Sequence, residues 1–272
     1  MQRFLALVAA TLLGCAAAPN GRAADARAPL RVMTFNIEYG SAGLDTIAGT
    51  IRAAGAEIVG LQEVDVHWSP RSAFVDQASA LAQRLGMQVR FAPIYSLPGL
   101  HDADSRREFG VALLTRLPIT AFRNDTLTRL STQEKEPVAM PMPGLLDATL
   151  DAHGTSIRVL VTHLDYRADP RVRAAQVAET LHQLDASSAP TLLFGDLNAV
   201  PDSPELAPLL ARLRDAAPST NGAGLTYPAD VPAKRIDYVL ASSRFRVRSA
   251  AVIDARASDH RPVVATLDLP RR

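Results

Sequence analysis

The chain has 272 residues, 47% of them hydrophobic and 21% charged, a composition that suits one globular domain and excludes a disordered or collagen-like chain. Its 29 Lys and Arg residues nearly balance 28 Asp and Glu residues, so the formal net charge is +1. Because this balance leaves no basic excess to attract a polyanion, nucleic acid is not favoured as a substrate, although a few well-placed arginines would suffice.

The first residues have the pattern of an export signal. Arg3 precedes an apolar stretch from Phe4 to Leu13 that is far too short to span a membrane, and small and polar residues follow. We therefore expect residues 1–24 to be a signal peptide and the protein to be exported.

Cys15, the single cysteine, lies in "LLGC", which resembles a bacterial lipobox. Two outcomes stay open. Lipidation at Cys15 would give a membrane-anchored periplasmic lipoprotein, whereas cleavage further on, for instance after Ala23, would give a periplasmic or secreted protein. In both cases the mature domain has no disulfide.

Strand-like and helix-like patterns alternate after a linker that ends near Ala28. We expect helices over 44–55, 74–86, 169–185 and 203–213, and strands over 30–39, 57–64, 110–116, 119–127, 145–152, 156–164, 190–198, 235–242, 245–253 and 262–269. Residues 131–144 are expected to form an irregular surface loop. Because strands outnumber helices and include antiparallel hairpins, the pattern favours packed sheets with helices outside them, an α/β fold.

Polar residues recur where the apolar strands end, at positions where burial without partners would be costly. Each one alone could cap a turn, but strand ends converge in space. Acids, amides and two histidines gathered at one sheet edge suit a hard divalent cation and a phosphate ester. These residues are Asn36, Glu38, Glu63, His163, Asp196, Asn198, Asp237, Asp259 and His260.

Seven motifs carry a family resemblance. The stretches "FNIE", "LQEVD", "FGVALLTR", "THLD", "GDLN", "RIDYVL" and "SDHRPV" occur in the order and spacing of the endonuclease/exonuclease/phosphatase superfamily, over about residues 30–268. The chain most resembles the bacterial metal-dependent hydrolase branch. The resemblance implies one catalytic domain over residues 28–270, a DNase I-like four-layer α/β/β/α sandwich of two mixed β-sheets with the site at one end.

The resemblance also implies catalytic roles. His260 matches the general base that activates water for in-line attack on phosphorus, and Asp237 matches the carboxylate that fixes its tautomer. Asp196 matches a residue that orients the nucleophile or handles the leaving-group proton. Asn198 and His163 match phosphate-binding positions, and His163 is also a candidate acid.

A metal site is implied beside them, for Mg²⁺ with Mn²⁺ as a substitute. Glu63 matches the principal ligand, and Asn36 lies close to both metal and phosphate. Asp259 matches a metal-site residue that points away from the base. Glu38 would add a carboxylate two residues after Asn36 on the same face of the strand.

Four further residues are weaker candidates. Glu108 could pair with His163. Arg106, Arg107 and Arg173 could touch substrate, but a solvated surface charge is the better interpretation of each.

The expected function is Mg²⁺-dependent hydrolysis of a phosphodiester or phosphomonoester in a lipid or small molecule. An extracytoplasmic nuclease is the alternative. A non-enzymatic binding module on the same fold is disfavoured, because every motif position keeps a chemically competent residue. The only partner implied is the phosphate-ester substrate; no protein partner is indicated, and membrane contact would come only through a lipid at Cys15.

Overall fold

The computed structural model describes residues 28–217 and 224–270, which form two six-stranded sheets. The predicted signal peptide and Cys15 lie outside the described residues. The first sheet contains, in spatial order, β11 (Arg246–Val252), β12 (Val263–Asp268), β1 (Leu30–Asn36), β2 (Ile58–Val66), β4 (Arg107–Thr115) and β3 (Gln88–Leu97). The second contains β5 (Ile119–Arg129), β6 (Met140–Ala152), β7 (Thr155–His163), β8 (Thr191–Asp196), β10 (Asp237–Ala241) and β9 (Arg214–Asp215).

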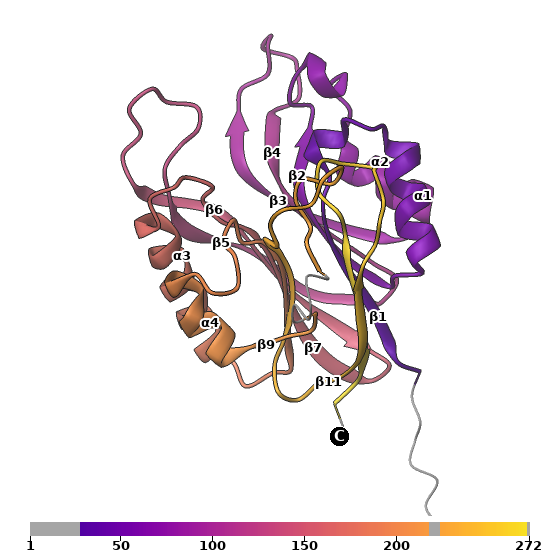
Figure 1. Ribbon diagram of the computed structural model, residues 1–272. Coiled ribbons are helices and arrows are strands. Elements are labelled where there is room, and N and C mark those ends of the chain that lie inside the picture. Colours follow the sequence, from indigo (N-terminus) through magenta and orange to yellow (C-terminus); the bar gives the residue numbers. More distant parts are fainter. Residues whose placement is uncertain (1–27, 218–223, 271–272) are drawn as a thin grey trace, which may run out of the picture.

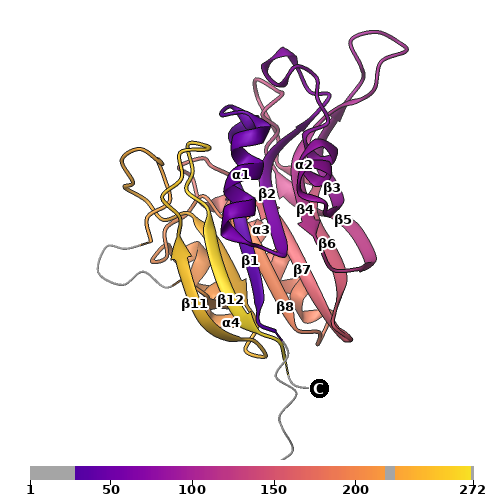
Figure 2. The ribbon, with the colours of Figure 1, turned by 90° about the vertical axis from the view of Figure 1, so that its right-hand side faces the viewer.

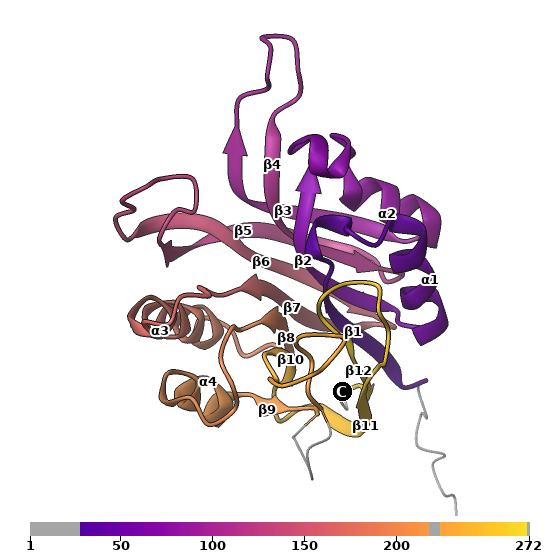
Figure 3. The same cartoon turned by 45° about the horizontal axis from the view of Figure 1, so that its top comes forward.

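Helices cover the outer face of each sheet. Helices α1 (Leu44–Ala54) and α2 (Gln77–Leu85) lie on the first sheet, and α3 (Arg171–Asp185) and α4 (Ala207–Arg212) lie on the second. Figure 3 shows the four layers from above, with the sheets in the middle and the two helix pairs outside (Figures 1 and 2 give the side views). Both sheets are mixed, because β1–β2 and β7–β8 are parallel and the other pairs antiparallel. The predicted α/β/β/α sandwich is confirmed.

Three apolar clusters fill the spaces between the layers. The central one joins the inner faces of the sheets, for example Val32 and Leu113 with Val159 and Phe194. The outer two lie beneath the helices, one under α1 and α2 and the other under α3 and α4. Burial of these apolar surfaces is the main force that holds the layers together. Within the described residues, none of the helices has the length and apolar character needed to cross a membrane.

The strand directions place the polar residues at one end of the sandwich. Asn36 is the last residue of β1, His163 the last of β7 and Asp196 the last of β8. In Figure 1, β1 starts at the lower end of the sandwich and runs upward, so its last residue, Asn36, lies at the upper end.

Prolines conceal one strand, and the beginning of another, from sequence patterns. β3 was not expected; it contains Pro93, which is tolerated because β3 is the edge of its sheet. β6 begins at Met140, so the loop predicted over 131–144 is too long. Its first residues, which include Pro141 and Pro143, pair only with β5, and pairing with β7 begins at Leu146.

The helix ends follow the expected chemistry. Gly55 and Gly86 end α1 and α2 in the left-handed conformation. α2 begins later than predicted because the Asp76 side chain accepts a hydrogen bond from the Ser79 N–H, 2.9 Å, and caps the helix there.

The close approach of the two sheets depends on Gly60. A Cβ atom at this position of β2 would lie 2.7 Å from Cβ of Phe194 on β8.

We predict that Gly60→Ala destabilises the protein by about 1–3 kcal/mol through overpacking, measured by urea denaturation. Gly49→Ala is the matched control: nothing lies within 4 Å of the new Cβ in α1, so stability should rise by about 0.5–1 kcal/mol. Equal effects of the two changes would contradict this account of the packing.

Candidate active site

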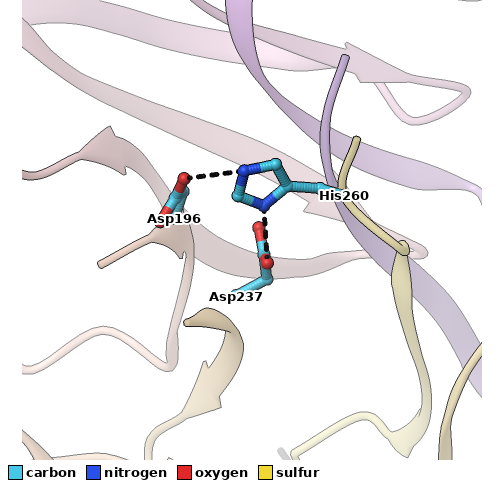
Figure 4. Close-up of side chains that lie close together, drawn as sticks. All are labelled: Asp196, Asp237 and His260. Carbon is cyan, nitrogen blue, oxygen red and sulfur yellow. Dashed lines mark hydrogen bonds and ion pairs between the residues drawn. The ribbon is translucent and has the colours of Figure 1, made fainter. Parts of the chain in front are cut away.

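A histidine lies between two buried carboxylates at the site end of the sandwich (Figure 4). Nδ1 of His260 is 2.9 Å from Oδ2 of Asp237, and Nε2 is 3.6 Å from Oδ2 of Asp196. All three side chains are buried. When Asp237 accepts the hydrogen on Nδ1, the lone pair of the neutral ring is left on Nε2, on the side of Asp196.

Three polar side chains of the second sheet, those of Asp237, Asp196 and His163, stand at paired positions on adjacent strands. Asp237, at the start of β10, is the antiparallel register partner of Asp196, and His163, at the end of β7, is its parallel partner. Nε2 of His163 is 3.6 Å from Oδ2 of Asp196. The two histidines therefore approach the same carboxylate oxygen.

His260 itself comes from the loop before β12 of the first sheet. Its N–H donates to Oγ of Ser258, 3.1 Å, and the ring of Tyr227 packs against the imidazole with centroids 4.7 Å apart. The loop that leads into the first sheet thus inserts its histidine between two carboxylates of the second sheet.

The Asn36 amide also joins the two sheets. Its Nδ2 donates to Oε1 of Glu63 and to Oδ2 of Asp196, both at 3.1 Å. Asn36 is fully buried, so both amide hydrogens are used, and the amide holds one carboxylate from each sheet.

A β-bulge aims Glu63 at the site. In the pairing of β2 with β4, Leu61 faces Ala112 and Val64 faces Gly110, so Gln62 and Glu63 together oppose one residue. Glu63 has φ 57°, an uncommon value for a residue other than glycine. Such bulges redirect a side chain locally, and here the Glu63 carboxylate reaches Asn36.

Three carboxylates, those of Glu38, Glu63 and Asp259, lie near one another at the site. Glu38 and Asp259 line one cavity of about 380 Å³. Burial and the charges of Glu38 and Glu63 raise the pKa of Asp259, although His260 opposes them. Mutual repulsion among oxygen donors is relieved by a hard divalent cation, so Glu38, Glu63 and Asp259 fit such an ion by charge and donor type.

The atoms of Asp196, Asp237 and His260 also lie within 4.8 Å of one another, close enough to be considered for a metal ion. However, the imidazole uses opposite nitrogens toward the two carboxylates. The imidazole ring therefore lies between the two carboxylates, an arrangement that suits proton transfer. Its two nitrogens face in opposite directions, so the three side chains do not converge on one position for a metal ion.

The electrostatics of this cluster favour bound protons. Burial opposes a charged imidazole, but Asp237, Asp196 and Asp259 outweigh it and raise the pKa of His260 to about 10. Burial, with the Asp237 charge, also raises the pKa of Asp196.

Two sequence-based details differ from the structure. β1 ends at Asn36, so Glu38 is not on the same strand face; it lies in a 3₁₀ turn with φ 46°, and its side chain accepts from Oγ of Ser41, 2.6 Å. Asn198 lies beyond the end of β8, and one of its amide hydrogens is donated to the Leu164 carbonyl, 3.0 Å.

The weaker candidates lie elsewhere. Glu108 accepts from Ser96 Oγ, 2.6 Å, and the carboxylate beside His163 is Asp196, so the predicted pairing of Glu108 with His163 is wrong. Arg106 is exposed and donates to Ser96. Arg173 is only 6% exposed and paired with Glu205, which contradicts its interpretation as a surface charge.

The remaining weak candidate, Arg107, donates to the Pro98 carbonyl, 2.9 Å, within the β3–β4 hairpin. That contact ties its guanidinium to the hairpin backbone.

Sequence reasoning missed Arg129. This buried guanidinium donates to the carbonyls of Pro143, Gly144 and His163 at 2.9 to 3.1 Å, and so fixes the backbone that carries His163. Burial lowers the pKa of Arg129 to about 10. An isolated arginine beside an expected loop carries no pattern that would have singled it out.

The fold and the site together define a DNase I-like α/β protein with buried acids and histidines at one end of the sandwich. The sequence model of the endonuclease/exonuclease/phosphatase family matches residues 33–260, and the chain belongs to this family. Its members hydrolyse phosphoester bonds and typically depend on divalent metal ions.

Several solved structures resemble this one. An endonuclease/exonuclease/phosphatase from Beutenbergia cavernae is 28% identical with a TM-score of 0.72, over 90% of this chain and 72% of that one. The catalytic domain of human Nocturnin with bound sulfate is 23% identical (TM-score 0.66; 89% and 93% covered). A mannosyl-6-phosphatase from Bacteroides thetaiotaomicron is 16% identical (TM-score 0.65; 88% and 100% covered). The last two show the fold alone. No curated protein matches the sequence.

The raised pKa of His260 has a consequence for stability. In the metal-free protein, the proton on His260 stabilises the folded state fully below the ordinary pKa of 6.5, and this contribution is lost as pH rises through about 10. We predict that His260→Gln costs the most stability, on the order of a few kcal/mol, near pH 6 and that the difference from wild type shrinks toward pH 10.

Urea denaturation in EDTA at pH 6, 8 and 10 measures this. Val263→Ala, a core truncation on β12 that removes no titratable group, should cost the same at each pH. A loss for His260→Gln that does not change with pH would contradict the predicted linkage.

Proposed function

We propose that this protein is an exported Mg²⁺-dependent phosphoesterase that hydrolyses a phosphodiester or phosphomonoester of a small molecule or lipid. The observation that carries the proposal is the position of His260 between Asp237 and Asp196, beside Glu38, Glu63 and Asp259, where burial and the neighbouring carboxylates raise the pKa of Asp259. A base held in one tautomer next to a cation site is what water attack on phosphorus requires.

In the proposed reaction His260 is neutral, because its pKa of about 10 in the metal-free protein would fall once a cation offsets the nearby carboxylate charge. Nε2 of the neutral ring takes a proton from the attacking water while the water oxygen forms a bond to phosphorus. Asp237 holds Nδ1–H and stabilises the resulting imidazolium. The bond between phosphorus and the leaving oxygen breaks on the opposite side, and His163 or Asp196 returns a proton to that oxygen. Atoms and charge balance: one water is consumed, and an alcohol and a phosphate product are released.

The cation would be held by Glu63, with Glu38 and Asp259 near it, and when bound it would neutralise negative charge on the phosphate. The Asn36 amide keeps Glu63 and Asp196 at fixed positions relative to each other. His163, 15% exposed beside the buried Asp196, would contribute positive charge to the pentacoordinate transition state.

Several observations favour a small-molecule or lipid ester over nucleic acid. The net charge of +1 provides little long-range attraction for a polyanion. Of the similar folds, one is named as a mannosyl-6-phosphatase and another was solved with a bound sulfate, an anion with the shape of phosphate. Export, with or without a lipid anchor at Cys15, is part of the proposal and rests on the pattern of residues 1–24.

The proposal predicts Mg²⁺-dependent hydrolysis by residues 25–272 of at least one of bis-p-nitrophenyl phosphate, sphingomyelin and an inositol phosphate, with plasmid DNA left intact. His260→Gln should lower turnover about 10²- to 10⁴-fold, because the proton acceptor is lost. Glu63→Gln should raise the Mg²⁺ concentration needed for half-maximal rate by about tenfold or more.

His153→Gln in an exposed turn and Glu57→Gln just before β2 are the matched controls and should behave like wild type. Wild-type rates in His260→Gln, with the fold intact by circular dichroism, would refute the assignment of the base. Mg²⁺-dependent nicking of plasmid DNA with the esters untouched would replace the proposed substrate class by nucleic acid.

A further inference from the structure

Two cavities near the candidate catalytic residues share no lining residue. The one of about 380 Å³ is lined by Glu38, Ser258 and Asp259, on the cation side. The other, of about 80 Å³, is lined by His163 but not by His260, Asp237 or Asp259. In an in-line displacement the leaving group departs opposite to the nucleophile. If His260 activates the water and His163 returns the proton, the leaving group would face the smaller cavity that His163 lines.

One wall of this smaller cavity is aromatic and rigid. The rings of Tyr95 and Phe109 stack with centroids 6.3 Å apart, and Trp68 packs against both, at 6.1 and 5.8 Å. The Tyr95 hydroxyl accepts a hydrogen bond from the Thr132 N–H, 2.8 Å. This bond and the ring contacts hold the Tyr95 ring in one orientation.

Tyr166, whose residue surface is 64% exposed, also lines this cavity. The Arg167 guanidinium lies 5.1 Å from the centre of its ring. Tyr166 follows β7 in the segment that leads into α3 (Figure 3). The exposed ring of Tyr166 leaves an aromatic surface open to a ligand.

The backbone on both sides of Tyr166 is held firmly. The Asp165 N–H donates to Oε1 of Gln176, 2.9 Å, and the Arg167 N–H donates to Oδ1 of Asp165, 2.9 Å. The Arg173 guanidinium donates to the carbonyls of Asp165 and Arg167. The segment thus offers an exposed aromatic ring from a preorganised backbone, which lowers the entropy cost of binding.

The floor of the cavity includes Gln176. This side chain is fully buried, and its Nε2 has no hydrogen-bond partner among the described residues. Since Oε1 is held by Asp165 N–H, the amide cannot turn over without losing that bond. An unpaired buried amide donor is costly for folding alone, and it adds a polar group to a cavity whose lining combines aromatic rings with aliphatic and charged side chains.

We propose that this ring cleft, formed by Tyr95, Phe109, His163, Tyr166, Arg167 and Gln176, binds a planar aromatic or heteroaromatic ring in the leaving group of the substrate. The inference rests on the proposed function, which it narrows to phosphoesters of ring-bearing alcohols. Flat rings pack well against rigid aromatic faces, beyond what their buried area alone provides.

The size of the cleft favours a single ring over a long acyl chain. A volume of about 80 Å³ is roughly half of the ~150 Å³ of a closed cavity that holds benzene. One ring would therefore lie partly in the cleft and partly against the exposed Tyr166, whereas most methylenes of a long chain would remain outside. The guanidinium of Arg167 and the Gln176 amide would also be poor neighbours for an alkyl chain.

Matched substrates test the cleft directly. Benzyl phosphate and cyclohexylmethyl phosphate, used as monoesters and as methyl diesters, have primary-alcohol leaving groups that differ mainly in ring planarity. We expect kcat/KM to favour the benzyl ester by about tenfold. Tyr166→Ala should abolish this preference through a loss on the benzyl ester only, whereas Tyr166→Phe and the exposed-loop control Val138→Ala should keep it. Equal rates on the two esters in wild type would overturn the ring cleft while leaving the proposed hydrolysis intact.

A binding measurement separates the cleft from the chemistry. By calorimetry on the wild-type protein, benzylphosphonate should bind about tenfold more tightly than methylphosphonate, and Tyr166→Ala should remove the difference. This result would support the cleft even if every ester were left unhydrolysed, an outcome that counts against the proposed function alone. Equal affinity of the two phosphonates for wild type would overturn the cleft.

Discussion

The hydrogen bonds of the Asn36 amide connect the two halves of the site. Asn36 is the last residue of β1 in the first sheet, and its amide donates both to Glu63 of the same sheet and to Asp196 of the second. The Asn36 amide thereby fixes the position of Glu63, the proposed cation ligand, relative to Asp196 beside the histidines. Glu63 lies on β2 and Asp196 on β8, and these two strands are in close contact inside the sandwich, where Gly60 meets Phe194. Packing of the sheets therefore brings the two carboxylates together. The precision of the site therefore depends on the interior of the sandwich as well as on its polar end.

The charges that this arrangement concentrates are unfavourable for folding by themselves. Asp196 and Asp237 are directly opposed on adjacent strands and buried, and Asp259 is placed near Glu38 and Glu63. Such groups keep protons or attract cations. His260 relieves part of the repulsion, which is why its pKa rises to about 10, and a divalent cation would relieve the rest. Assembling these carboxylates costs free energy, and a bound proton or metal ion recovers part of it. The same repulsion therefore gives the site its affinity for both.

The sequence allowed the architecture and the group of polar residues to be predicted, because hydrophobic periodicity and motif order survive in it. It could not reveal how each residue reaches the site. Glu63 depends on a β-bulge and a positive φ, and Glu38 on a turn that begins after the strand ends. Arg129 and Tyr227 act through contacts between segments distant in the chain, and Pro93 hides an edge strand. These features follow from tertiary pairing, which leaves no local signal in one sequence.

We propose that His260 and Asp237 handle protons while a metal ion is held on the side of Glu63. An anomalous difference map from crystals soaked in Mn²⁺ tests it most directly, because it locates the ion independently of any substrate. The account predicts a peak beside Glu63, with the hydrogen bond between His260 and Asp237 retained. A peak enclosed by Asp196, Asp237 and His260 would make these residues metal ligands and would contradict the assignment of the base.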